Sequence, residues 1–402
     1  MTNSLAKYFR GVGAKRLTEV EINPSTSNQH EFNGINEFQN IFGTEKIKFT
    51  AKFILLNDEE EKLIEQEGFL TWYDARKDHP TRSSEYRLYY STNEVIDKSS
   101  VGDLAVIAMT GKDSVVVIVA PYNSTSEKQL MWLFDLQEVE QKFIVKDLTE
   151  KKNDLGFAGK YIISSLGFEI EEEEKNYLDL ILKTFGDKFP STIEFSRFAR
   201  STMDEFSPDK DPDEALLAYL EREEILFRTL ERYIVETKLK EGFGKNGIDV
   251  DEFIQFSLSV QNRRKSRAGL GFENQLAYIF KVLKIQFTKK GKTENNYEPD
   301  FLFPGIESYN NPNFNSLYLT MLGLKTTAKE RWRQILPEAN RIWPKHLITL
   351  EPAISKNQTD QMKTEKLQLV IPKGIMPTYT EEQQKELINL SDFISIVLKK
   401  YI

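Results

Sequence analysis

The sequence has no cysteine, few histidines and no long apolar run, and each absence excludes a class of protein. Without cysteine, the 402 residues cannot form a disulfide scaffold, a thiolate metal site or a cysteine nucleophile. The three histidines, His30, His79 and His346, lie too far apart for a zinc-binding motif. No stretch approaches the roughly 18 apolar residues of a membrane span, and the N-terminal residues carry no apolar signal segment. The sequence therefore predicts a cytoplasmic protein with no membrane partner.

Basic residues are outnumbered, but the charge is distributed unevenly. The chain has 54 Lys and Arg against 62 Asp and Glu, a net charge of −8. This balance argues against a uniformly basic nucleic-acid-binding protein, although binding needs only a local basic face. Acid is concentrated in Glu169–Glu174, and other segments are locally basic. With 40% hydrophobic residues, the chain is long enough for two or three globular domains.

The first 145 residues are rich in short strand patterns. Leu104–Met109 and Val115–Ala120 are apolar, β-branched runs joined by turn-type residues, which predicts a hairpin. Arg87–Tyr90 and Leu130–Phe134 are further predicted strands. Short strands at this spacing are typical of barrels, so we expect residues 1–145 to form a β-rich, barrel-like domain.

The remainder of the chain divides into a linker and a second domain. Residues 146–195 are polar, acidic and punctuated by glycine, and we interpret them as a partly ordered linker. In residues 196–402, helix and strand patterns alternate, which predicts an α/β domain with a mixed central sheet. The predicted helices are 211–234, 250–260, 272–283, 327–342 and 381–398, and the predicted strands are 300–303, 317–324, 346–350 and 367–371. The expected fold class is multidomain α+β.

Three ionisable residues of the second domain have the chemistry of a nuclease site. Asp300 opens a predicted strand, Lys325 ends the next one, and Glu338 follows on a predicted helix. Carboxylates are oxygen ligands suited to Mg²⁺, which activates water and offsets charge on a phosphodiester. A lysine beside them orients that water or stabilises the developing phosphorane. The structural alternative is a common Pro-Asp turn and a solvated lysine.

The spacing of these residues leaves the second acid open. The familiar nuclease pattern places an acid two residues before the lysine, but Gly323 occupies that position and cannot bind metal. Either the site is inactive or the acid comes from elsewhere. Glu338 and Glu330 are the local candidates, and Glu273 on a predicted amphipathic helix offers a further carboxylate.

Two basic clusters indicate DNA as the substrate. One lies in 262–269 and the other in 329–334; their candidate DNA-recognition residues are Arg263, Arg264, Lys265 and Arg267, and Lys329, Glu330, Arg331 and Arg333. Arginine reads guanine in the major groove and glutamate accepts from cytosine, so the second cluster is suited to G·C pairs. The alternative for both is an exposed, charged helix face.

These motifs resemble a known family. The segments NRRKSRAG (262–269), PDFLFP (299–304), KTTAKERWRQIL (325–336) and DPDEALL (211–217) are similar to those of the EcoRII-type restriction endonucleases, type IIE enzymes of the PD-(D/E)XK superfamily. The resemblance covers about residues 205–400. It implies a restriction-endonuclease-like fold in the C-terminal domain and a catalytic set in which the second acid has migrated towards the helix after the lysine.

The resemblance also assigns roles to individual residues. It implies that Asp300, Lys325 and Glu338 are catalytic, with Asp300 and Glu338 holding Mg²⁺ and Glu273 near the metal. It implies that the triplet Lys329, Glu330 and Arg331 reads C·G pairs. Tyr309 matches a tyrosine at the same distance after PDFLFP, although a packing role is the alternative.

The N-terminal domain resembles the same family through shorter pieces: Ala14–Thr18, Gln29–His30 and Arg87–Tyr90. In the family this part is an effector domain, a DNA-binding pseudobarrel. The candidate effector-DNA contacts are Lys15, Arg16, His30, Arg76, Lys77, Arg82 and Arg87.

Two departures from the family affect this expectation. The family stacks flipped bases on an aromatic residue and an arginine four positions apart, whereas Tyr219 and Arg222 are at a different spacing. The basic arm expected after the Tyr-Tyr strand is replaced by the nearly neutral Ser91–Ser100. The central base pair, the length of the recognition site or base flipping itself can therefore differ.

The resulting hypothesis is a homodimeric, Mg²⁺-dependent, site-specific endonuclease that cuts double-stranded DNA at a CC/GG-containing palindrome. Two-fold DNA symmetry requires a two-fold protein, and a cognate DNA methyltransferase is the implied functional partner. Two alternatives remain open: an endonuclease that requires modified DNA, and a DNA-binding regulator with an inactive nuclease fold.

Overall fold

The computed structural model describes residues 4–22, 30–58, 63–77, 79–149, 155–170, 177–203, 205–329, 331–352 and 354–400. The chain forms two compact units. The N-terminal unit comprises residues 1–171 with the short segments 352–356 and 378–380, and the C-terminal unit comprises the remainder.

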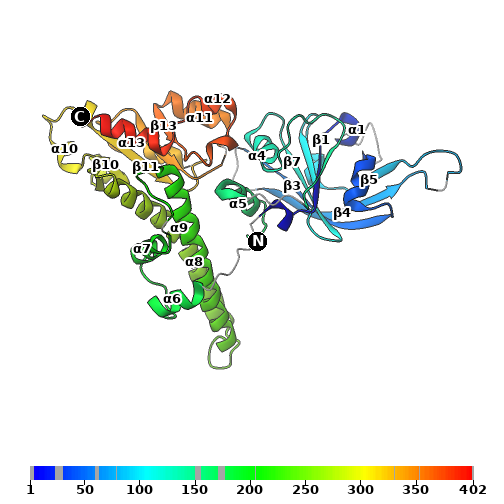
Figure 1. The fold of residues 1–402 in the computed structure, drawn as a ribbon, viewed down its shortest axis with the longest axis horizontal. Coiled ribbons are helices and arrows are strands. Elements are labelled where there is room, and N and C mark those ends of the chain that lie inside the picture. Colours follow the sequence, from blue (N-terminus) through cyan, green and yellow to red (C-terminus); the bar gives the residue numbers. More distant parts are fainter. Residues whose placement is uncertain are drawn as a thin grey trace. The chain divides into compact units, whose positions relative to one another are not determined.

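The N-terminal unit is built on a curled sheet of eight strands in the order β2-β5-β4-β3-β7-β6-β1-β8 (Figure 1). The pairing of β3 with β7 is parallel, and the other pairings are antiparallel. The predicted hairpin of residues 104–120 is confirmed as β6 and β7. The strands are β1 Gly11–Arg16, β2 Glu31–Asn33, β3 Ile47–Leu55, β4 Ile64–Asp74, β5 Tyr86–Tyr90, β6 Leu104–Met109, β7 Ser114–Ala120 and β8 Ile144–Asp147.

This sheet buries both faces, each against its own hydrophobic core. Alternate side chains of β6 enter opposite cores, Val106 one and Ile107 the other, because successive residues of a strand point to opposite faces. The first core is completed by α4 (Thr125–Leu133) and α5 (Gly156–Ser165), and the second by aromatic residues of β3 and β4. Three short helices complete the unit: α1 Glu19–Ile22, α2 Gln39–Phe42 and α3 Glu94–Asp97.

One predicted strand of this unit is wrong. Residues 130–134 lie at the end of α4, not in a strand. The Ser124 side chain accepts a hydrogen bond from the Glu127 N–H and caps a helix that begins at Thr125, five residues before the predicted strand. The apolar run alone could not distinguish a strand from a buried helix segment.

The described helices of the interval 146–195 are divided between the two units, α5 in the N-terminal unit and α6 and α7 in the C-terminal unit. Ile162 and Ile163 of α5 lie in the first N-terminal core. The helices α6 (Tyr177–Phe185) and α7 (Thr192–Ser201) contribute Ile181 and Phe195 to a core with α8. Most of the acidic run lies outside the described residues.

The C-terminal unit contains a five-stranded mixed sheet in the order β13-β12-β11-β10-β9. Its strands are β9 Thr288–Lys289, β10 Phe301–Phe303, β11 Thr320–Lys325, β12 Lys345–Thr349 and β13 Leu367–Val370. The pairings of β10 with β9 and β11 are antiparallel, and those of β12 with β11 and β13 are parallel. The helices that follow in the chain are α10 Ile306–Asn310, α11 Lys356–Thr364, α12 Glu381–Gln384 and α13 Leu390–Lys399. The mixed sheet predicted from the alternating pattern is confirmed.

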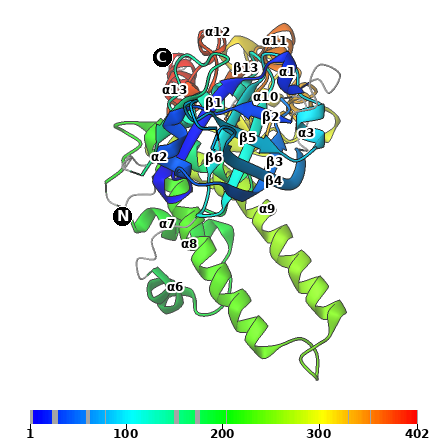
Figure 2. The ribbon, with the colours of Figure 1, turned by 90° about the vertical axis from the view of Figure 1, so that its right-hand side faces the viewer.

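Two long helices, α8 (Pro212–Glu241) and α9 (Val250–Val282), lie side by side as an antiparallel pair (Figure 2). The start of α8 follows the predicted signal, because the Asp211 side chain accepts from the N–H groups of Asp213 and Glu214. The two helices predicted at 250–260 and 272–283 are one continuous helix, since the glycines between them do not interrupt it. No helix in the described part of the chain is long and apolar enough to cross a membrane.

The predicted helix at 327–342 is wrong. Within it, the described residues form a short 3-10 turn, Trp332–Ile335, followed by irregular backbone. The buried residues Ala328, Trp332 and Ile335 imitate helical spacing. However, Pro337 lacks a backbone donor and Ala339 has a left-handed φ of 48°, so the helix cannot continue. Glu338 consequently lies in a loop between β11 and β12.

Candidate active site

Asp300 and Lys325 are brought together by the antiparallel pairing of β10 and β11. Phe301 is paired with Leu322, which places the preceding residue, Asp300, opposite Gly323. The Asp300 Oδ2 atom accepts a hydrogen bond of 2.7 Å from the Leu324 N–H. Burial raises the pKa of the Asp300 carboxyl, and the positive charge of Lys325 acts in the opposite direction. The acid and the base predicted from sequence thus share one environment.

The loop after the 3-10 turn adds Glu338 to this environment. Burial and the neighbouring charge of Asp300 raise the pKa of Glu338 to about 7, while Lys325 and Lys345 oppose the rise. The Glu338 Oε2 atom is buried and has no hydrogen-bond partner among the described residues. A buried carboxylate oxygen without a partner is unfavourable unless something binds it.

Glu273 reaches the same region from α9. Its buried side chain forms ion pairs with Lys289 (3.4 Å) and Lys290 (3.1 Å). The charge of Glu273 also raises the pKa of Asp300. The two lysines offset part of its charge, so Glu273 lies at the edge of the site.

The donor set suits a hard cation. Asp300 and Glu338 provide two carboxylates, and the unpartnered Glu338 Oε2 has a free acceptor. Within the described ranges, no group of three or more His, Asp or Glu side chains has the arrangement of a metal site. Mg²⁺ commonly binds one or two carboxylates together with water and substrate phosphate oxygens, so this set fits it.

The triplet Lys329, Glu330 and Arg331, which was predicted to read C·G pairs, follows β11 in the chain. Glu330 lies outside the described residues. The N–H groups of Ala328 and Lys329 donate to Glu351 Oε2 at 2.6 and 3.0 Å, which fixes the backbone at these two residues. The Arg331 side chain is exposed.

The side chain of Arg333, two residues further on, is held by contacts within the C-terminal unit. Its guanidinium donates to Gln361 Oε1 (2.7 Å) and lies over the Trp332 ring. The Arg331 side chain is therefore more available for DNA contact than that of Arg333.

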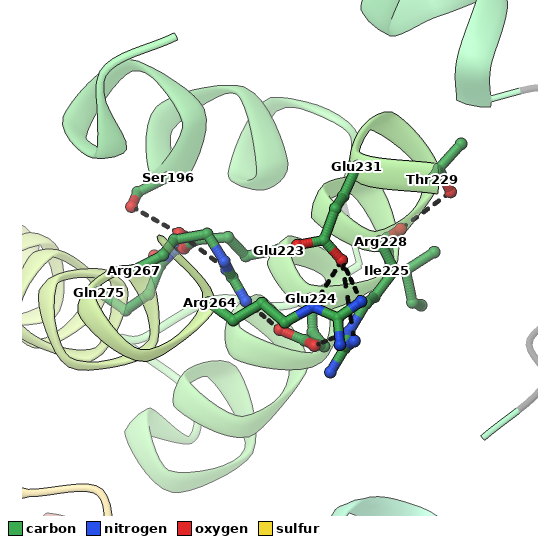
Figure 3. A network of polar contacts seen from close by, with 10 residues as sticks. All are labelled: Ser196, Glu223, Glu224, Ile225, Arg228, Thr229, Glu231, Arg264, Arg267 and Gln275. Atoms are coloured by element: carbon green, nitrogen blue, oxygen red, sulfur yellow. Dashed lines mark hydrogen bonds and ion pairs between the residues drawn. The ribbon is translucent and has the colours of Figure 1, made fainter. Parts of the chain in front are cut away.

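Two of the four cations of the basic cluster on α9 form ion pairs with acidic residues of α8 (Figure 3). Arg264 donates to Glu231 at 2.6–2.7 Å. The nearly buried Arg267 pairs with Glu224 and lies 3.6 Å from Glu223. These pairs hold the two helices together.

The other two cations of this cluster lie in different surroundings. Arg263 lies over the Phe189 ring, and Lys265 is exposed.

Tyr309 is buried, and its hydrogen bonds are to residues of the C-terminal unit. Its hydroxyl donates to Glu294 at 2.6 Å, and burial is the main reason that its pKa is raised. Arg341 donates to the carbonyl oxygens of Tyr309, Asn311 and Phe314. This network borders the loop that carries Glu338.

Most of the predicted effector-DNA residues form ion pairs within the N-terminal unit. Lys15 pairs with Glu21, Arg16 with Glu127, Arg76 with Glu85, Lys77 with Glu45, and Arg87 with Glu31 and Glu85. His30 packs edge-on against the Tyr90 ring, and Arg82 is exposed.

Tyr219 and Arg222, the residues nearest to the family's base-stacking pair, have structural partners. The Tyr219 hydroxyl donates to the Phe206 carbonyl oxygen at 2.9 Å. Arg222 donates to the Thr202 carbonyl oxygen at 3.0 Å and lies over the Tyr177 ring. Neither side chain is presented as a stacking surface.

Three polar residues of the site were not predicted: Glu294, Lys345 and Glu351. Lys345 immediately precedes the predicted strand 346–350, and a lysine at a strand end is normally solvated. Lys345 and Glu351 are nevertheless buried, and both bind loop backbone. Only the three-dimensional arrangement reveals these roles.

Comparison with known proteins supports the resemblance. Residues 227–394 match the sequence model of the family described as EcoRII C terminal. The chain is 37% identical over 230 residues to the type II restriction enzyme EcoRII of Escherichia coli, covering 57% of this chain and 55% of that protein. The chain thus spans about half the length of this curated relative. The family resemblance drawn from the motifs is confirmed for this part of the chain.

Two DNA complexes are among the solved structures that part of the chain resembles. Metal-depleted Ecl18kI in complex with uncleaved, modified DNA has a TM-score of 0.45 and 19% identity, covering 56% of this chain and 83% of that one. A restriction endonuclease PspGI–substrate DNA complex has a TM-score of 0.42 and 14% identity, covering 53% of this chain and 93% of that one.

Proposed function

We propose that this protein is a site-specific restriction endonuclease that hydrolyses phosphodiester bonds of double-stranded DNA. The observation that carries the proposal is the shared environment of Asp300, Lys325 and Glu338: the charge of Lys325 acts on both carboxyl groups, and that of Asp300 acts on Glu338. The similarity of residues 227–394 to the EcoRII C-terminal family supports the same reaction.

The chemistry follows from the residues present. Asp300 and Glu338 would hold Mg²⁺, which lowers the pKa of water and offsets charge on the scissile phosphate when it is bound. Lys325 then stabilises the negative charge that develops as water attacks phosphorus and the ester oxygen departs. The Leu324 N–H orients the Asp300 carboxylate towards the strand that ends in Lys325.

Recognition and regulation are part of the proposal. Arg331 is exposed on the turn after β11, and with Lys329 and Glu330 it would read C·G pairs. Lys265 is the exposed lysine of the α9 cluster and would contact phosphate. In this proposal the protein is a cytoplasmic homodimer that recognises a CC/GG palindrome. A cognate DNA methyltransferase is its functional partner.

We further propose that the curled N-terminal sheet is the effector pseudobarrel. Among its candidate DNA contacts, Arg82 and His30 form no ion pair with the described residues. Effector binding through Arg16 or Arg87 would require their ion pairs with Glu127 and Glu31 to open.

Digestion of unmethylated and methylated plasmid DNA with Mg²⁺, followed by sequencing of the ends, tests the function. Cutting of unmethylated DNA at one CC/GG-flanked site is the expected result. Cutting of methylated DNA alone would favour the modification-dependent enzyme. Specific binding without cutting of either plasmid would favour the inactive regulator.

A further inference from the structure

The loop that carries Glu338 is held by a lysine buried beneath it. Lys345 is the first residue of β12, and its relative exposure is 0%. Its Nζ atom donates to the carbonyl oxygen of Glu338 and, at 3.2 Å, to that of Ala339. One ammonium group thus binds two consecutive peptide groups of the catalytic loop.

The backbone at this point needs such support. Ala339 has a φ of 48°, a left-handed conformation that is unfavourable for alanine. Because side-chain orientation follows the backbone, the direction of the Glu338 carboxylate depends on this conformation.

Glu294 and Arg341 also hold this loop, and together with Lys345 they form what we call the clamp. The Asn340 N–H lies 3.4 Å from Glu294 Oε2, and Glu294 itself accepts from the Tyr309 hydroxyl. Arg341 anchors the end of the loop on the carbonyl oxygens of Tyr309, Asn311 and Phe314. Glu338 is therefore flanked by fixed backbone, while its own Oε2 atom has no partner among the described residues.

We propose that Lys345 is a positioning residue, which keeps Ala339 left-handed and thereby aims the Glu338 carboxylate at the metal site. The proposal rests on the proposed function, because it concerns the same carboxylate. Lys345 makes no contact with substrate in this account; it acts by holding the loop backbone, in addition to the effect of its charge on Glu338. A buried ammonium is costly unless it is hydrogen-bonded, and here two loop carbonyls provide that compensation.

Lysine is suited to this task because its ammonium has three donors and no acceptor. Methionine has a similar length but cannot donate to the two carbonyl oxygens. In Lys345→Met we expect Ala339 to relax to a right-handed conformation, which rotates the Glu338 carboxylate away. Loss of an outer partner of a metal ligand typically weakens metal affinity by about 10- to 100-fold.

The test measures Ca²⁺ binding by calorimetry to the full chain, and DNA binding without metal. Lys345→Met should bind Ca²⁺ about 10-fold or more weakly than the wild type, with metal-free DNA affinity unchanged. Lys385→Met, at an exposed position, is the matched control and should bind Ca²⁺ normally. Adding Lys345→Met to Glu338→Gln should cause no further loss, because both changes act on one carboxylate.

A rescue variant separates positioning from general structural support. Glycine adopts a positive φ without the penalty of alanine, so Ala339→Gly should restore part of the Ca²⁺ affinity of Lys345→Met. Normal Ca²⁺ affinity in Lys345→Met, or losses that add in the double variant, would overturn the proposal.

Glu294→Ala covers the case in which Lys345→Met does not fold. It removes the contact to Asn340 from a partly exposed turn, and it should weaken Ca²⁺ binding in the same direction; unchanged affinity would count against the clamp. A wild-type protein that binds Ca²⁺ but cuts no DNA would refute the endonuclease function while leaving the role of Lys345 intact.

Discussion

The Asp300 carboxylate accepts a hydrogen bond of 2.7 Å from the backbone N–H of Leu324. Leu324 immediately precedes Lys325 on β11, whereas Asp300 immediately precedes β10. One side-chain contact therefore fixes the acid relative to the strand that carries the lysine. A carboxylate that is bound by the backbone N–H of a paired strand is positioned more precisely than an acid on an unsupported loop.

Substitutions of Arg267 and Lys265 should distinguish a cation that stabilises the fold from one that binds DNA. Arg267→Ala leaves the buried Glu223 without this cation and removes one of the two arginine partners of Glu224, so we expect a loss of about 3 kcal/mol in stability. Lys265→Ala, at an exposed position, should change stability by less than roughly 0.5 kcal/mol. Denaturant unfolding measures both.

The same pair should behave oppositely with DNA. Lys265→Ala should weaken DNA binding and reduce the slope of log K against log salt by about 1, as expected for one lost phosphate contact. An unchanged salt slope in Lys265→Ala would remove this lysine from the interface. A fully stable Arg267→Ala would contradict the role of the ion pair.

Arg331 and Arg333 offer a matched pair for sequence recognition. Arg331→Ala should lower affinity for the specific site by about 1–3 kcal/mol and leave non-specific binding nearly unchanged, because one bidentate base contact is lost. Arg333→Ala is the control, since Arg333 is held by Gln361 and Trp332. Binding isotherms with specific and scrambled duplexes distinguish the two, and equal effects would argue against Arg331 as a base reader.

His346 should make the protein sensitive to acid. Burial lowers its pKa to about 4 from an ordinary value of 6.5, with the charge of Lys400 as a smaller cause. Between these values the unfolded chain binds the proton and the folded chain does not, so stability falls as pH decreases from about 6.5 to 4. The linkage amounts to roughly 3 kcal/mol.

His346→Leu removes this titration. Thermal unfolding at pH 7 and pH 4 should show a smaller acid-induced decrease for His346→Leu than for the wild type. Parallel decreases in the two proteins would show that other groups account for the acid sensitivity.

Much of the sheet and the first half of the site could be predicted from sequence. The strands around Asp300 and Lys325 follow from apolar runs with a polar residue at one end, since such runs mark buried strands whose ends carry function. The N-cap at Asp211 and the hairpin of β6 and β7 were also predicted, because their signals are local. The structure bears these elements out.

The second half of the site depends on interactions that a local pattern does not contain. Ala328, Trp332 and Ile335 imitate a helix because they face one core, although Pro337 and the left-handed Ala339 prevent one. The partners of Arg264 and Arg267 on α8 are more than 30 residues away, so the sequence displays the cations without their acids. Lys345 is a lysine in an apolar strand, and only its contacts with two loop carbonyls explain why it is buried there.

Cleavage by Asp300→Ala, measured together with DNA binding, tests the central claim most directly. The assay compares single-turnover cutting of plasmid DNA in Mg²⁺ by the wild type and Asp300→Ala, and binding of the same site without cleavage in Ca²⁺. We predict that the wild type cuts at one defined sequence, and that Asp300→Ala binds this sequence but does not cut it. Mg²⁺-dependent cutting retained by Asp300→Ala would contradict the assignment of Asp300 and the active site built around it.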